Sequence, residues 1–187
     1  MRVIETDFDG VIILEPIVHE DTRGFFMESY NDRLLSQLGI SVRFVQDNHS
    51  LSIKAGTVRG LHYQLHPQAQ AKLVRVTRGV IYDVVVDIRR GSPTFGKWRS
   101  FILSEHNKRQ LFVPKGFAHG FCTLVPNTEV QYKVDAYYSA EYDRGIFWRD
   151  PDLKIDWPVT EAVLSEKDAS LPLLNNAHIN FIWERTS

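Results

Sequence analysis

Length, composition and charge narrow the class of protein before any motif is considered. The chain has 187 residues, 43% hydrophobic and 24% charged, which is enough for one soluble domain with a sizeable core. Lysine and arginine total 22 against 23 aspartates and glutamates, and no long basic or acidic run occurs. This balance argues against nucleic acid or a membrane surface as the main partner. We expect a single domain over residues 1–187.

The expected location follows from residues that export or membrane insertion would require. Glu5 and Asp7 stand where a secretory signal peptide would have its apolar core. No run approaches the ~18 apolar residues that span a bilayer. The single cysteine, Cys122, has no internal partner for a disulfide, which fits a reducing compartment. We therefore expect a cytoplasmic protein.

In chain order, the first half reads as short strands separated by turns. Residues 11–14 form an apolar strand, and residues 25–30 follow a turn at 21–24. A short helix is expected over residues 32–38, with Asn31 as its N-cap and Gly39 as its stop.

The second half continues the strand pattern. Residues 72–77 alternate, with Lys72 on the same face as two valines, and residues 80–88 are nearly apolar on both faces, as in the middle of a sandwich. Further strands are expected near 98–103 and at 110–113. Residues 128–135 alternate strictly and place Tyr132 on the interior side with Val130 and Val134.

After residue 151 the pattern weakens. A short helix could open at residues 165–168, and residues 175–187 have no clear pattern. Many short strands with regular turn signals predict an all-β fold, a β-sandwich or jelly-roll barrel with a few short helices.

Four side chains near strand edges suggest the chemistry. His62, Lys72, His119 and Tyr132 suit proton transfer next to a carbonyl and are poorly suited to nucleophilic attack or redox work. No cysteine pair or carboxylate cluster accompanies them. A structural histidine, a packed tyrosine and, for Asp168, a helix-capping role after Ser165 are the plain alternatives.

Two segments resemble the signature motifs of the cupin superfamily. Residues 114–119 fit the latter half of its second motif, ending at His119, and His62 stands at the first position of H-x-H in its first motif. Gln64 replaces the second histidine and no glutamate follows before Gly79, so two of four usual metal ligands are absent. We expect no metal, because a divalent site usually needs three or four ligands.

A more specific resemblance covers roughly residues 1 to 174. The chain resembles the dTDP-4-dehydrorhamnose 3,5-epimerase family in an ordered set of segments, at residues 23–26, 44–48, 59–64, 72–74, 114–121, 156–158 and 164–168. The resemblance implies a cupin-type jelly roll. It also implies cofactor-free inversion of C3 and C5 of a dTDP-4-dehydro-6-deoxy sugar through an enolate, in dTDP-L-rhamnose biosynthesis.

The resemblance also assigns roles to residues. It implies that His62 is the base, Asp168 its acidic partner, Tyr132 the acid on the opposite face and Lys72 the group that stabilises the enolate oxygen. A free imidazole has a pKa of about 6.5 and a free phenol of about 10, which suits a base and an acid at neutral pH. Substrate-binding positions implied by the family are Arg23, Glu28, Gln46, Asn48, Arg59, Lys72, His119, Asp143 and Lys167.

The family further implies a homodimer in which an N-terminal strand of one subunit reaches the pocket of the other. The apolar strand 11–14 and the Phe25–Phe26 pair are consistent with such an exchange, and Phe25, Phe26, Tyr137 or Tyr138 could stack on thymine.

Several alternatives remain open from the sequence. A related 3-epimerase, 5-epimerase or 3,4-ketoisomerase could keep the same histidine and tyrosine. Two further alternatives are a catalytically silent carbohydrate-binding cupin and a metal-dependent cupin enzyme that uses His62 and His119.

Overall fold

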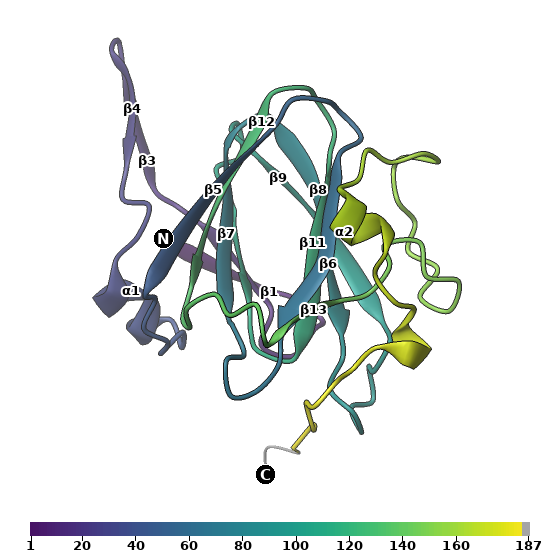
Figure 1. The fold of residues 1–187 in the computed structure, drawn as a ribbon. Helices are drawn as coiled ribbons and strands as arrows, with labels where there is room; N and C mark the ends of the chain where they lie inside the picture. The colour runs from purple at the N-terminus through teal and green to yellow at the C-terminus, as the bar shows by residue number, and fades with distance from the viewer. Residues whose placement is uncertain (185–187) are drawn as a thin grey trace.

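The computed structural model describes residues 1–184, which are built mainly from antiparallel strands (Figure 1). The strands are β1 (Arg2–Glu5), β2 (Ile12–Glu15), β3 (Val18–Asp21), β4 (Gly24–Met27), β5 (Gln46–Ser52), β6 (Val58–Gln64), β7 (Lys72–Arg78), β8 (Val80–Asp87), β9 (Trp98–Ser104), β10 (Gln110–Val113), β11 (Phe117–Thr123), β12 (Thr128–Val134) and β13 (Asp143–Gly145). The helices are α1 (Asp32–Gln37), α2 (Glu166–Ala169) and the 3-10 turn η1 (Leu174–Asn176).

Two sheets form a sandwich. One sheet has six strands in the order β1-β2-β10-β7-β12-β5, and the other has five in the order β13-β6-β11-β8-β9. Strands β3 and β4 form a separate hairpin that projects away from the body (Figure 1). The predicted all-β sandwich with a few short helices is confirmed. Among residues 1–184, no helix reaches the length and apolar character needed to cross a membrane.

The core follows the alternation of the strands. Val74 and Val130 of the six-stranded sheet meet Val85 and Phe121 of the five-stranded sheet between the layers. The outer face of the six-stranded sheet is covered by α1, whose Asn31 side chain accepts a hydrogen bond from the backbone of Leu34 as predicted. This helix ends as expected before Gly39, which has a φ of 86°.

The tail, where the sequence showed no clear pattern, has a regular arrangement in its described part. Residues 175–184 do pack: Ala177, Ile179 and Phe181 are buried against the outer face of the five-stranded sheet, while their neighbours at 178, 180 and 182 are exposed. The period of two in these apolar positions was the signal for an extended segment.

The expected exchange strand also lies differently. β2, which contains most of residues 11–14, pairs with β1 on one side and with β10 on the other, and Leu14 is fully buried. In this chain, its backbone hydrogen bonds are therefore made inside its own sheet. The exposed N-terminal element is the β3–β4 hairpin instead, which carries Phe25 and Phe26.

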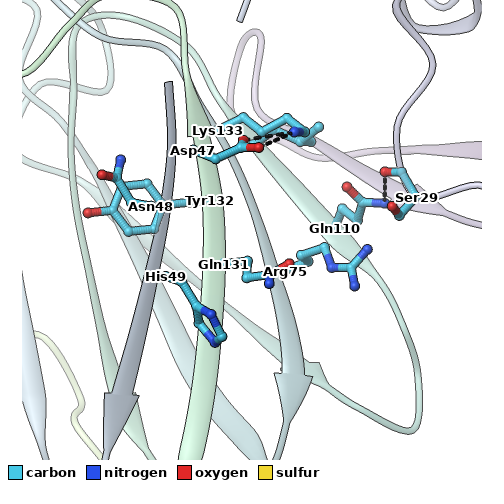
Figure 2. A pocket seen from close by; sticks show the side chains of 10 residues that line it. Ser29, Asp47, Asn48, His49, Arg75, Gln110, Gln131, Tyr132 and Lys133 are labelled. Atoms are coloured by element: carbon cyan, nitrogen blue, oxygen red, sulfur yellow. Dashed lines mark hydrogen bonds and ion pairs between the residues drawn. The ribbon is translucent and has the colours of Figure 1, made fainter. Parts of the chain in front are cut away.

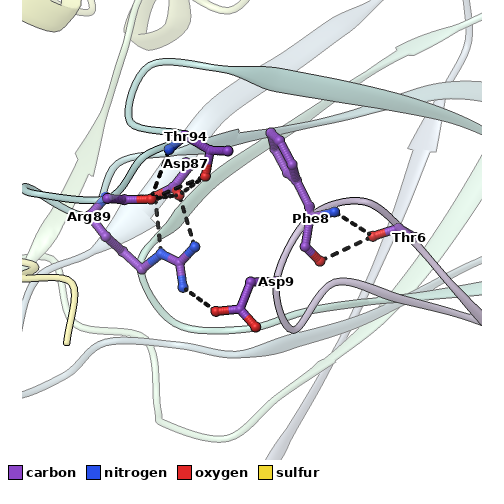
Figure 3. Close-up of polar contacts among 7 residues, drawn as sticks. Thr6, Phe8, Asp9, Asp87, Arg89 and Thr94 are labelled. Carbon is purple, nitrogen blue, oxygen red and sulfur yellow. Dashed lines mark hydrogen bonds and ion pairs between the residues drawn. The ribbon is translucent and has the colours of Figure 1, made fainter. Parts of the chain in front are cut away.

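A buried polar network fixes the end of β8 (Figure 3). Asp87 is fully buried and accepts hydrogen bonds from Arg89 at 2.8 Å and from Thr94 at 2.7 Å. Arg89 also reaches Asp9 in the N-terminal turn, at 3.4 Å. Because a buried carboxylate is stable only when its oxygens are paired, this network ties the N-terminal turn to the loop between β8 and β9.

Candidate active site

The site lies between the two sheets. Two adjoining cavities of about 390 and 210 Å³ share four lining residues, which are His62, Lys72, Tyr132 and Lys167. His62 comes from β6 of the five-stranded sheet, and Lys72 and Tyr132 come from β7 and β12 of the six-stranded sheet. An imidazole and a phenol from opposing sheets therefore face one space.

A bulge in β6 gives the site its register. His62 pairs with His119, while Arg59 pairs with Phe121, so Gly60 and Leu61 together oppose the single residue Gly120. Strict alternation would place Arg59 and His62 on opposite faces, but the extra residue brings both into the same cavity. Gly60 has a φ of 119°, and a Cβ there would lie 2.6 Å from the Cα of Gly120.

His62 is held by a carboxylate. Its Nε2 lies 2.5 Å from Oδ1 of Asp168, which is 4% exposed. Burial acts to raise the pKa of Asp168, but the hydrogen bond and charge of His62 outweigh it, and the net pKa is lowered. An ionised Asp168 selects the tautomer that donates from Nε2, and so leaves Nδ1 as the nitrogen that can accept a proton.

Asp168 also lies in the first turn of helix α2, where its backbone takes part in the cap. The hydroxyl oxygen of Ser165 accepts a hydrogen bond from the backbone N–H of Asp168 at 3.1 Å, which caps α2. The cap uses the backbone of Asp168, while its carboxylate is free to turn toward His62.

A second histidine–carboxylate pair lies deeper. His119 Nε2 is 2.9 and 3.0 Å from the two carboxylate oxygens of Asp83, and both side chains are buried. Burial raises the pKa of Asp83, while His119 and Lys72 act in the opposite direction. Sequence reasoning missed Asp83. Its signal was an acid within the otherwise apolar run of residues 80–86, where an unpaired carboxylate would be unstable.

Lys72 is a buried ammonium group. It is 8% exposed, and its Nζ donates to the backbone carbonyl of His62 at 3.2 Å. Burial lowers its pKa to about 8, against the opposing charges of Asp83 and Asp143. A group in this state stabilises negative charge that develops nearby.

Tyr132 is partly buried, and burial raises the pKa of its phenol above the ordinary value, with Arg59 acting to lower it. The phenol is thus protonated at neutral pH and is able to donate.

A separate groove of about 170 Å³ lies on the outer face of the same sheet, toward which alternate side chains of β12 point (Figure 2). Figure 2 shows Tyr132 and Asn48 turned away from Lys133 and Arg75, as expected for neighbouring strand positions.

Most of the other expected binding residues gather around these cavities, which are lined by Gln46, Asn48, Arg59, His119, Asp143 and Lys167. Arg59 donates to the Ser52 hydroxyl at 3.1 Å, and Lys167 forms an ion pair with Asp143. Burial acts to lower the pKa of Lys167, but the hydrogen bond that it donates to Asp143, together with the charge of that carboxylate, outweighs burial, so the net pKa is raised. A buried Ser50 hydroxyl, also in the cavity, has no partner among residues 1–184 and was not foreseen.

Two expected residues lie outside the pocket of their own chain. Arg23 sits at the tip of the β3–β4 hairpin, paired with Asp21 at 2.5 Å and 88% exposed. Glu28 accepts a hydrogen bond from Asn31 at 3.1 Å and is exposed. The projecting hairpin carries Arg23 away from the sandwich, and Glu28, directly after the hairpin, lines neither cavity, so the described chain alone does not bring them to His62.

The polar groups do not form a metal-ligand set. In the part of the chain that the structure describes, no three side chains of histidine, cysteine, aspartate or glutamate are grouped to hold a metal ion. His62 and His119 each have one ring nitrogen directed at a carboxylate. The donor set present is thus two separate histidine–carboxylate pairs.

Known proteins are similar to this chain in sequence and fold. The family model described as dTDP-4-dehydrorhamnose 3,5-epimerase matches residues 5–176. A protein of that name from Shigella flexneri is 54% identical over 169 residues, or 90% of this chain and 93% of its own.

Two solved structures are similar throughout. That of a Bacillus anthracis dTDP-4-dehydrorhamnose 3,5-epimerase with TDP and PPi bound has 60% identity and a TM-score of 0.90, covering 92% of this chain and 98% of its own. That of a Legionella pneumophila dTDP-6-deoxy-D-glucose-3,5-epimerase in complex with dTDP-4-keto-L-rhamnose has 50% identity and a TM-score of 0.90, covering 94% and 93%. The chain belongs to the dTDP-4-dehydrorhamnose 3,5-epimerase family.

Proposed function

We propose that this protein inverts C3 and C5 of dTDP-4-dehydro-6-deoxy-D-glucose to give dTDP-4-dehydro-L-rhamnose, a step of dTDP-L-rhamnose biosynthesis. The observation that carries the proposal is the placement of His62 and Tyr132 on opposing sheets around one cavity that also holds Lys72. An inversion needs a base on one face of the carbon and an acid on the other. Family membership supports the same substrate class.

The first step is removal of a proton. The C4 ketone acidifies the protons on C3 and C5, and Nδ1 of His62 takes one of them. The C–H electron pair becomes the C–C double bond of an enolate, and the carbonyl electrons move onto O4. Asp168 stabilises the imidazolium that forms, since it is already hydrogen bonded to the other ring nitrogen.

The enolate is then quenched from the opposite face. The Lys72 ammonium group stabilises the charge on O4, and His119, held by Asp83, provides a second polar contact near the sugar. The Tyr132 phenol gives its proton to the carbon, which is thereby inverted. No cofactor enters this scheme, because the substrate ketone receives the electrons.

The remaining positions serve the nucleotide. Arg59 and Lys167 are cationic groups at the cavity wall that fit the diphosphate, and Gln46, Asn48 and Asp143 offer polar contacts at its mouth. The exposed aromatic rings of the hairpin and of Tyr138 fit a flat thymine base.

The working unit we propose is a homodimer of single-domain chains spanning residues 1–187. Arg23, on the β3–β4 hairpin with its exposed Phe25 and Phe26, and Glu28, directly after that hairpin, would then reach the pocket of a partner. A cytoplasmic location fits the free, buried Cys122 and a nucleotide-sugar substrate.

Solvent labelling tests the reaction. In D2O, with dTDP-4-dehydro-6-deoxy-D-glucose as substrate, proton NMR is expected to show deuterium at C3 and at C5 together with the L-rhamno product. Label at only one carbon would support a single-site epimerase instead. Binding of the nucleotide sugar without any deuterium exchange would indicate a carbohydrate-binding protein with no epimerase activity.

Replacing the acid separates the two half-reactions. Tyr132→Phe removes the phenol proton but keeps the ring, so proton removal by His62 continues while inversion falls by roughly 10²–10⁴-fold. The same NMR assay is expected to show exchange at C3 or C5 without matching product. Epimerisation at the wild-type rate would mean that another group is the acid.

A further inference from the structure

Three glutamines hold one short segment at the mouth of the larger cavity. We infer that Gln46, Gln64 and Gln70, called here the glutamine clamp, position residues 136–139 so that Tyr138 forms a fixed wall for the nucleotide. Gln64 is the central member. The inference rests on the proposed function, since it concerns how that same site binds its substrate.

The side chain of Gln64 forms its hydrogen bonds with backbone groups. It is 3% exposed and follows His62 by two positions on β6, so both side chains point into the cavity. Its Nε2 donates to the carbonyl of Gln68 at 2.6 Å and to that of Tyr137 at 3.1 Å, and its Oε1 accepts from the N–H of Ser139 at 2.7 Å. Both donors and one acceptor position are used, which directs this amide to positioning the loop.

The other two glutamines grip the same segment from different elements. Gln46 on β5 accepts from the N–H of Tyr138 at 3.0 Å and donates to Asn48 at 2.9 Å. Gln70, just before β7, donates to the carbonyl of Ala136 at 2.8 Å. Every residue from 136 to 139 is thus bonded through its backbone to a glutamine side chain.

The held segment presents aromatic rings. Tyr138 is 59% exposed, lines the larger cavity and donates from its hydroxyl to Asp143 at 3.2 Å. An exposed ring on a mobile loop would have to be ordered when ligand binds, which weakens affinity. A backbone fixed at four points removes most of that loss, so the clamp acts on binding and leaves the chemistry at His62 alone.

Two substitutions of Gln64 make this testable. Gln64→Met keeps the length but removes all three hydrogen bonds. Gln64→Glu removes both donors and sets a negative charge against two carbonyl oxygens, whereas its protonated form regains one donor. We expect the Kd for dTDP, measured by calorimetry, and the KM for the nucleotide sugar to rise about tenfold in both variants, with kcat within about threefold.

The pH dependence distinguishes positioning from general damage. Relative to wild type, the Kd of Gln64→Glu should fall as pH is lowered from 8 to 5.5, because the buried carboxyl becomes protonated, while Gln64→Met should show no such recovery. Gln37→Glu, on the exposed face of α1, is the matched control and should leave Kd unchanged. Hydrogen exchange of the 136–139 amides should be faster in both Gln64 variants without ligand.

A double-mutant cycle tests the route through Tyr138. If the clamp acts through this ring, Gln64→Met should have little further effect on Kd in a Tyr138→Ala background. Equal effects in both backgrounds would overturn the inference, as would unchanged dTDP affinity in Gln64→Met. Should the Gln64 variants fail to fold, Gln70→Met, at a half-buried position, carries the same prediction. Wild-type turnover is measured alongside, so a wild type without epimerase activity refutes the proposed function separately.

Discussion

Lys72 differs from an ordinary surface lysine in that its ammonium group is buried. Burial lowers its pKa from 10.5 to about 8, so the folded protein holds this ammonium at a free-energy disadvantage. We predict that Lys72→Met raises the free energy of unfolding at pH 7 by roughly 1–3 kcal/mol while abolishing epimerisation. Urea denaturation of both proteins checks the first part. A less stable variant would mean that the bond to the His62 carbonyl outweighs desolvation.

The Lys72 ammonium group is also expected to set an upper pH limit for activity. Above pH 8 the folded protein releases the Lys72 proton, while the unfolded chain keeps it up to about 10.5, so wild-type stability rises relative to Lys72→Met across this window. Activity should move in the opposite direction, because a neutral amine no longer stabilises the enolate. We expect kcat/KM to fall as pH rises through about 8, and Lys72→Arg, if active, to lose that limb.

Single substitutions separate the proposed role of the Asp168 carboxylate from the helix cap at its backbone. Asp168→Asn keeps the backbone N–H that Ser165 caps but removes the carboxylate that orients His62, so kcat should fall by about 10²–10⁴-fold with little change in stability. Ser165→Ala should do the reverse, with a loss of about 1 kcal/mol in stability and a nearly normal kcat. Steady-state kinetics and thermal unfolding of the pair measure both. A similar fall in kcat in both variants would show that the cap and the carboxylate do not act separately.

At the scale of elements, the bulge in β6 is what brings Arg59 and His62 together. Gly60→Ala would place a Cβ 2.6 Å from Gly120 and 2.7 Å from the His119 carbonyl, at a φ of 119°. We predict a loss of roughly 2–4 kcal/mol in stability and severe loss of activity, because β6 must shift against β11. Gly91→Ala shares a positive φ but meets no atom within 4 Å, so it should cost only about 1 kcal/mol.

Element by element, the sequence predicted what hydrophobic alternation can reveal. Strands β7, β8 and β12 and helix α1 follow apolar or capping signals and lie where expected. β5 was missed because Gln46, Asn48 and Ser50 face the cavity, so a strand that lines a polar site lacks apolar alternation.

The site was predictable only in part for related reasons. The resemblance supplied His62, Lys72, Tyr132 and Asp168, which the fold does bring together. The partner of His119, Asp83, lies on a strand distant in sequence, and only the register of β8 against β11 reveals that the two meet. The bulge at Gly60 is likewise a property of strand pairing that alternation in one strand does not encode.

At the scale of the whole molecule, the β3–β4 hairpin projects from the sandwich and packs little against its own chain. It exposes Phe25 by 58% and Phe26 by 73%, and it carries Arg23 to a position outside the pocket of its own chain (Figure 1). Large exposed aromatic rings on a protruding hairpin mark an interaction surface. A two-fold dimer in which each hairpin completes the other pocket would account for all three residues.

Subunit complementation tests this arrangement. His62→Ala removes the base from one chain, and Arg23→Ala removes the hairpin cation from another, so each homodimer should be inactive or weak. If the hairpin serves the partner, a mixed dimer has one pocket with both defects and one intact pocket. Random reassociation of equal amounts should then restore about a quarter of wild-type kcat per chain. Mixtures no more active than the mean of the separate variants would show that each hairpin serves its own chain or no pocket.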